Sequence, residues 1–168
     1  MELIFPAMEH KLAAMEFRQE HIDCGEAWIH GGARLLQAED YESWLAAVIK
    51  MQTEVPLGFV TGDTYFAVVE GRIVGIISIR HELNDALMNC GGHVGFGVRP
   101  AERRKGYGAK MLALALVKCR ALGITRALVT CDRDNIASAE TIIKNGGILE
   151  NEVALDDGSI SQRYWISL

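Results

Sequence analysis

Apolar residues in the first third of the chain recur at intervals of three and four positions. This spacing predicts two helices, over residues 8–22 and 39–52. The apolar positions of the first helix include Leu12, Met15 and Ile22, so these side chains are expected to face the core. The second helix begins in a cluster of acidic residues, which is typical of the positive end of a helix.

Beyond residue 63 short β-rich runs alternate with helical ones. Strands are predicted over residues 64–69, 72–80, 91–98 and 124–131, helices over 106–123 and 134–147, and a terminal hairpin over 147–168. With a short apolar run at residues 2–5, the order is β-α-α-β-β-β-α-β-α-β-β. This order predicts an α/β fold, a mixed β-sheet flanked by helices, in one domain over residues 1–168.

The composition is that of a globular protein. Of the 168 residues, 49% are hydrophobic and 23% are charged, and no apolar run approaches the ~18 residues that span a bilayer. The N-terminal segment carries acidic residues and lacks the basic start of a signal peptide. The four cysteines, Cys24, Cys90, Cys119 and Cys131, lack the spacing of a zinc site or a disulfide framework. We therefore expect a soluble cytoplasmic protein without a metal site, whose cysteines are buried as small apolar residues.

The net charge is −5, yet basic residues gather in one short window. They are Arg99, Arg103, Arg104, Lys105 and Lys110. Only Glu102 opposes them within that window. A local positive patch on an acidic protein favours a small anionic ligand over a polyanion. RNA binding is the alternative, and the acidic net charge and the lack of interleaved aromatic residues argue against it.

This basic window lies between a predicted strand and the start of a predicted helix. The first turn of a helix exposes unpaired N–H groups and the positive end of the helix dipole, so an anion can bind there. Gly106 and Gly108 allow close backbone approach, and the neighbouring cations can reach a phosphate. The turn suits a pyrophosphate. Neither the P-loop pattern nor the dinucleotide-binding glycine pattern is present.

The stretch "VRPAERRKGYGAKML" resembles the acyl-CoA-binding signature of the GNAT acetyltransferases, with Arg103, Gly106 and Gly108 at its three defining positions. The preceding "GFGV" resembles the strand of that fold that splays from its neighbour beside the pantetheine arm. The helix over 134–147 resembles a later helix of the family. Together with "IRHELND" and "KNGGILENEV", these segments are similar to a subgroup of uncharacterised bacterial predicted acetyltransferases, for which no substrate is implied.

The resemblance implies an acetyl-CoA-dependent N-acetyltransferase that acts on a primary amine of a small molecule or peptide. It implies that the cofactor is bound by Phe96, Gly97, Val98, Arg103, Arg104, Lys105, Gly106, Tyr107, Gly108, Ala109, Asn135 and Ser138. The bare side of the strand at Gly95 and Gly97 suits either a cofactor or another backbone segment. A homodimer is common in such folds. The alternative function is an acyl-CoA-binding or sensing protein with weak or no catalysis.

Acetyl transfer to an amine requires a proton acceptor, because a protonated primary amine is not a nucleophile. His93, on the strand beside the thioester-orienting segment, is the candidate base, with a structural histidine as the alternative. Glu82 and Asp85 are placed to attract a cationic amine. At the position of the family's tyrosine acid this chain has Ile142, so the general acid stays open. A cationic substrate is also suggested by the acidic residues Glu39, Asp40, Glu42, Glu54, Asp156 and Asp157.

Overall fold

The computed structural model describes all residues from 1 to 168, in seven strands and five α-helices. The strands are β1 (Glu2–Ile4), β2 (Gly62–Val69), β3 (Arg72–Arg80), β4 (Val94–Val98), β5 (Arg126–Asp132), β6 (Ile148–Ala154) and β7 (Ile160–Ser167). The helices are α1 (Lys11–Asp23), α2 (Tyr41–Lys50), α3 (Asp85–Asn89), α4 (Tyr107–Ala121) and α5 (Ile136–Lys144). Apart from the short α3, the order of the elements agrees with the sequence prediction.

The strands form two antiparallel sheets, with the orders β1-β2-β3-β4 and β5-β7-β6. The predicted α/β fold class is confirmed, and the expected mixed sheet is divided in two because β4 and β5 form no ladder with each other. The hairpin between β2 and β3 turns at Glu70 and Gly71, which both have positive φ as such a turn requires.

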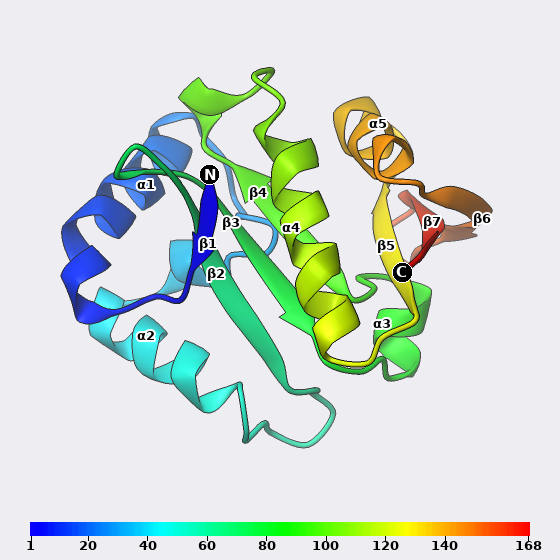
Figure 1. The fold of residues 1–168 in the computed structure, drawn as a ribbon, viewed down its shortest axis with the longest axis horizontal. Helices are drawn as coiled ribbons and strands as arrows, with labels where there is room; N and C mark the ends of the chain where they lie inside the picture. Colours follow the sequence, from blue (N-terminus) through cyan, green and yellow to red (C-terminus); the bar gives the residue numbers. More distant parts are fainter.

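Helices cover both faces of the first sheet (Figure 1). One face carries α1 and α2, whose side chains form a core cluster with Phe66 and Ile76. The other face carries α4, whose Met111 and Leu112 pack with Ile77 in a second cluster that reaches β5 and β7. The second cluster therefore holds the two sheets together beneath the gap between β4 and β5.

Helix α1 buries a different face from the one that the apolar spacing predicted. Ala14, Phe17 and His21 are buried, whereas Leu12 is 74% exposed and Ile22 is 42% exposed. The prediction was wrong for Leu12 and Ile22, whereas Met15 is half-buried against the core cluster. The buried face turns toward Phe17 because it is the largest apolar side chain of the helix and its burial removes the most apolar surface from water. His21 lies one turn further along and meets the Phe17 ring edge-on.

Candidate active site

The only backbone hydrogen bonds that link the β4 segment to β5 are at His93, the residue before β4 begins. The backbone N–H of His93 donates to the Leu128 carbonyl at 2.7 Å, and the backbone N–H of Leu128 donates to Nδ1 of His93 at 3.0 Å. Beyond this junction no hydrogen bond joins the two strands. A cavity of about 180 Å³ lies between them, lined by Phe96 from β4 and by Asn135 and Ser138 at the start of α5.

The edge of β4 that faces this gap carries free hydrogen-bonding groups. The N–H groups of Arg80 and Arg99 donate to His93 and Val74 across the β3–β4 ladder. Hydrogen-bonded and non-hydrogen-bonded pairs alternate along an antiparallel ladder. Since His93 and Arg99 are hydrogen-bonded to β3, the other odd-numbered residues between them are too, and the backbone N–H and C=O groups of the even-numbered residues point away from β3. The N–H groups of Val94, Phe96 and Val98 therefore face the gap, where an extended ligand could pair with the strand.

The bare side of β4 is covered by protein. A Cβ atom at Gly97 would lie 2.9 Å from the His30 carbonyl oxygen, and one at Gly95 would lie 3.1 Å from Nη1 of Arg80. The loop at His30 and Gly31 packs directly on these glycines. The second of the two readings of the glycines, a strand packed on another backbone segment, describes this side of β4.

The basic turn ends in a row of unpaired backbone donors. None of the N–H groups from Arg104 to Ala109 donates a hydrogen bond within the protein. Arg104 and Gly106 have φ values of 62° and 78°, and Gly106 begins α4 without a side-chain cap. Successive N–H groups in such a turn converge on one point, and the positive end of the helix dipole adds to their field. This arrangement can bind a phosphate.

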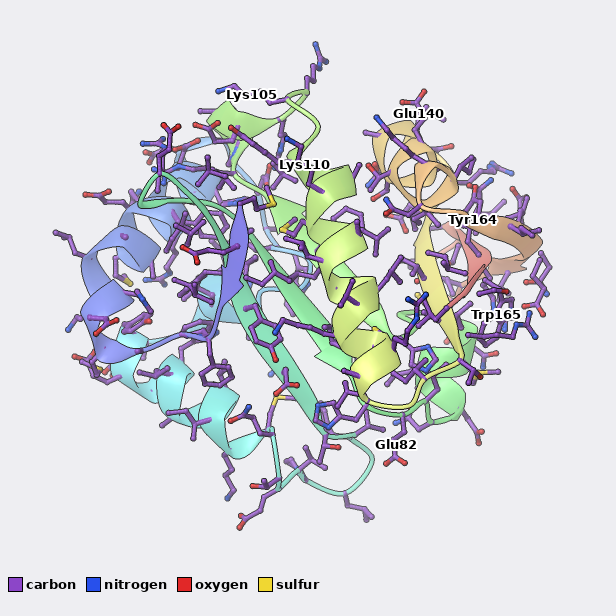
Figure 2. The ribbon with its side chains drawn as sticks, viewed as in Figure 1. Glu82, Lys105, Lys110, Glu140, Tyr164 and Trp165 are labelled. Atoms are coloured by element: carbon purple, nitrogen blue, oxygen red, sulfur yellow. The ribbon has the colours of Figure 1, made fainter.

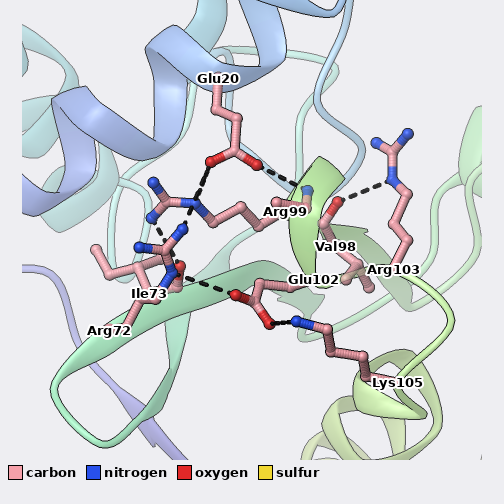
Figure 3. Close-up of polar contacts among 9 residues, drawn as sticks. Glu20, Arg72, Ile73, Val98, Arg99, Glu102, Arg103 and Lys105 are labelled. Atoms are coloured by element: carbon pink, nitrogen blue, oxygen red, sulfur yellow. Dashed lines mark hydrogen bonds and ion pairs between the residues drawn. The ribbon is translucent and has the colours of Figure 1, made fainter.

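The cations of the turn are engaged more than the sequence indicated (Figure 3). Arg103 donates to the Val98 carbonyl at 3.2 Å and pairs with Glu26, and Lys105 pairs with Glu102 at 2.8 Å. Arg104 has no ion pair and stays exposed. Figure 2 shows Lys105 on the turn that precedes α4.

Behind the turn, α1 and the loop after it supply carboxylates that the local sequence did not indicate. Arg99 is 6% exposed and donates to Glu20 at 2.6 Å. Glu26 binds both Arg103 and His21, and these contacts hold its carboxyl pKa below the usual value even though burial opposes them. Burial lowers the pKa of His21, whose Nε2 has no partner. The turn is therefore anchored to the α1 side of the molecule.

The two predicted α5 residues meet at the helix start. Oδ1 of Asn135 accepts a hydrogen bond from the Ser138 backbone N–H at 3.1 Å, as in an N-cap. The amide nitrogen of Asn135 has no partner in the protein, and both side chains line the small cavity. A capping role is thus present, and a further contact to a ligand remains compatible with it.

His93 and the tyrosines have structural contacts. His93 is 8% exposed, it lines neither the small cavity nor the larger one on the α2 side of the first sheet, and its Nδ1 is occupied by the Leu128 N–H. Burial lowers the pKa of His93, and the nearby Arg80 charge lowers it further. Ile142 is fully buried, and the Tyr164 hydroxyl donates to Gln162 at 2.7 Å. The role of His93 as base stays a prediction, and these contacts favour a structural role.

A second cavity, of about 720 Å³, lies on the α2 side of the first sheet. Trp28, Gly31 and Arg80 line both cavities, so the two meet at these residues. Glu82 and Asp85 are exposed, and neither lines either of these two cavities. Glu82 lies at the opposite end of the view from Lys105 (Figure 2).

Two groups of residues differ from their predicted places. The acidic residues proposed to attract a cationic substrate line neither cavity. Cys24 and Cys90 are exposed rather than buried, whereas Cys119 and Cys131 are buried as expected. Sequence reasoning missed Arg80 and Trp28, which carry no motif. The only signal that could have indicated Arg80 was its position at the end of a buried strand, and no signal indicated Trp28.

The sequence matches the model of the GNAT acetyltransferase family over residues 15–146. The chain belongs to this family. It is therefore an acetyltransferase by family, and the turn at Arg103–Gly108 and the gap beside β4 lie within the matched region.

Several solved structures share this fold. The microcin C7 self-immunity acetyltransferase MccE, solved with acetyl-CoA and AMP, is 16% identical with a TM-score of 0.70, covering 99% of this chain and 91% of that one. RimL, the ribosomal L7/L12 α-N-protein acetyltransferase solved with coenzyme A, is 14% identical with a TM-score of 0.72, covering 99% and 93%. Spermidine N-acetyltransferase SpeG of Vibrio cholerae is 10% identical with a TM-score of 0.67, covering 99% and 95%.

No curated protein matches the sequence. None of the helices is both long and apolar enough to cross a membrane.

Proposed function

We propose that this protein transfers the acetyl group of acetyl-CoA to a primary amine of a small molecule or peptide. The observation that carries the proposal is the row of unpaired N–H groups from Arg104 to Ala109 beside the free edge of β4. The first can bind the pyrophosphate, and the second can pair with the extended pantetheine arm. Similar structures solved with acetyl-CoA or coenzyme A support this co-substrate.

The residues that line the gap have separate roles in this proposal. Val98 and Phe96 orient the arm and the thioester carbonyl through their backbone N–H groups, while Asn135 and Ser138 contact the arm from α5. Arg103 reaches a phosphate by exchanging Glu26 for it. Lys105, Tyr107 and the two glycines of the turn complete the phosphate site as the family motif implies.

The reaction is a direct displacement. The amine nitrogen attacks the thioester carbonyl carbon, a C–N bond forms, the C–S bond breaks, and the coenzyme A thiolate leaves with the electron pair. A primary ammonium loses two protons in this reaction, one before the attack and one from the tetrahedral intermediate, and both pass to water in the large cavity or to His93. A thiol has a pKa near ~8.5, so the thiolate can leave without an enzymic acid. This accounts for a buried isoleucine at position 142.

An acyl-CoA-binding protein with weak catalysis is the second candidate. The absence of a tyrosine hydroxyl near the thiolate favours it, since Ile142 is buried and Tyr164 is bound to Gln162.

The test combines binding and turnover. Calorimetry with coenzyme A measures the site, and release of free thiol from acetyl-CoA with a panel of primary amines measures transfer. Amine-dependent thiol release together with an acetylated product in mass spectrometry is expected. Binding without amine-dependent release would favour the second candidate, and no binding would refute both.

A further inference from the structure

Arg80 is a cation without an anionic partner at the place where the two cavities meet. It is the last residue of β3, and no carboxylate lies within ion-pair distance of it. Its only side-chain hydrogen bond runs from Nη1 to the Gly91 carbonyl at 3.2 Å. Burial lowers the pKa of this guanidinium, which nevertheless remains charged at neutral pH. The remaining donors of this half-buried charge have no partner in the protein, so an anionic ligand could supply one.

The backbone around Arg80 is built to make room for it. A Cβ atom at Gly95 would lie 3.1 Å from Nη1 and 3.5 Å from Nη2, so any side chain there would displace the guanidinium. Gly31 packs on the same glycine, since its backbone nitrogen would lie 3.3 Å from that Cβ atom. The guanidinium thus lies beside Gly95 in β4, next to Phe96, whose backbone N–H faces the gap.

The charges of the large cavity favour an anion as well. Its charged residues are Arg34, Asp63 and Arg80. Asp63 is already bound, through His81 Nε2 at 3.0 Å and Gln52 at 2.7 Å. Asp63 keeps its negative charge, because these hydrogen bonds hold its carboxyl pKa below the usual value although burial opposes them. The two arginines and Asp63 together leave one net positive charge in the cavity, which disfavours a polyamine. Its apolar wall includes Trp28 and Phe59, which are 47% and 63% exposed.

We infer that the acceptor is an amino acid, whose carboxylate pairs with Arg80, whose side chain lies on the apolar wall, and whose α-amine is acetylated. The inference rests on the proposed acetyl transfer. A guanidinium can hold a carboxylate through two parallel hydrogen bonds, which would fix the adjacent amine at the junction of the two cavities.

The test pairs each L-amino acid with its carboxamide, which removes the carboxylate charge and keeps the side chain. At least one apolar amino acid is expected to be acetylated. For that substrate Arg80→Gln should lower kcat/KM by roughly 30-fold or more, and for its carboxamide by less than about threefold. Because the ratio compares each substrate with itself, differences in amine reactivity cancel. Arg120→Gln, an exposed arginine outside both cavities, is the matched control and should change neither value.

Several results would overturn the inference while the proposed function stands. One is transfer only to amines without a carboxylate, such as spermidine or the carboxamides. Another is an equal loss for both substrates in Arg80→Gln, or a loss confined to the KM of acetyl-CoA, since either places Arg80 on the scaffold or on the cofactor.

Two further measurements keep the test decisive. Arg80→Lys retains a charge but loses the two-pronged contact, so it serves if the glutamine variant does not fold. If coenzyme A binds but no acceptor turns over, amino acids should still raise the melting temperature of the coenzyme A complex more than their carboxamides do. No such difference would end the inference. Failure of coenzyme A to bind would instead refute the proposed function.

Discussion

Placing a negative charge at Gly106, in the phosphate turn, is the sharpest test of where coenzyme A binds. Gly106 has a φ of 78°, is exposed, and has no atom within 4 Å of the position of a Cβ. Asn and Asp are the residues that tolerate this conformation best, and both can cap a helix. Gly106→Asn and Gly106→Asp thus share their shape and backbone strain, and they differ by one negative charge.

The magnitude follows from the position of that charge. At about 6 Å from a pyrophosphate and an effective dielectric constant of about 50, each of two phosphate charges is repelled by about 1 kcal/mol. The sum of about 2 kcal/mol corresponds to a roughly 30-fold weaker coenzyme A affinity for the Asp variant at low salt. A Debye length of about 8 Å at 0.15 M salt should reduce the difference to about fivefold.

Calorimetry at ~10 mM and at ~0.15 M salt checks the two expected affinity differences. These two salt concentrations are used because the screening of charges differs strongly between them. Folding cannot mimic the result, because Asp at a helix N-terminus stabilises the helix dipole and should melt no lower than Asn. The same pair at Gly123, at the other end of α4 with a φ of 81° and no close neighbour, is the control and should leave the affinity unchanged. Equal affinities of the two Gly106 variants at low salt would show that the pyrophosphate binds elsewhere.

Three further predictions concern α5 and the buried histidines. Asn135→Ser keeps the cap to Ser138 and should preserve the melting temperature while raising the KM for acetyl-CoA by about fivefold, and an unchanged KM would leave Asn135 as a cap only. His93→Gln should lower the melting temperature by roughly 5 °C without changing the shape of the pH–rate profile, because the Leu128 N–H loses its acceptor; loss of the acidic limb with a roughly 100-fold lower rate would identify His93 as the base. Burial holds the pKa values of His21 and His93 below ~6.5, so at acidic pH the unfolded state binds more protons than the folded state does. The melting temperature should therefore fall as the pH is lowered from ~7.5 to ~5.5. A melting temperature that does not change with pH would contradict the assignment of both histidines as buried neutral rings.

The elements that the sequence predicted are those whose signal is local. The phosphate turn could be located because the change from strand to helix period and the glycine at position 106 lie within one short segment. The contacts that complete the site come from far away in the chain. Glu26 lies 77 residues before Arg103, and the loop that covers Gly97 precedes it by more than sixty. No local pattern encodes such contacts, and Arg80 carries no motif at all.

The turn also shows why glycine spacing indicates the site better than the number of cations. Arg103 is bound to Glu26 before any ligand arrives, so a phosphate that recruits it gains only the difference between two anionic partners. Lys105 is in the same position with respect to Glu102. The N–H groups from Arg104 to Ala109 have no competing partner within the protein, and their direction is fixed by the left-handed residues of the turn. The backbone is therefore preorganised for the anion, while the side chains follow it.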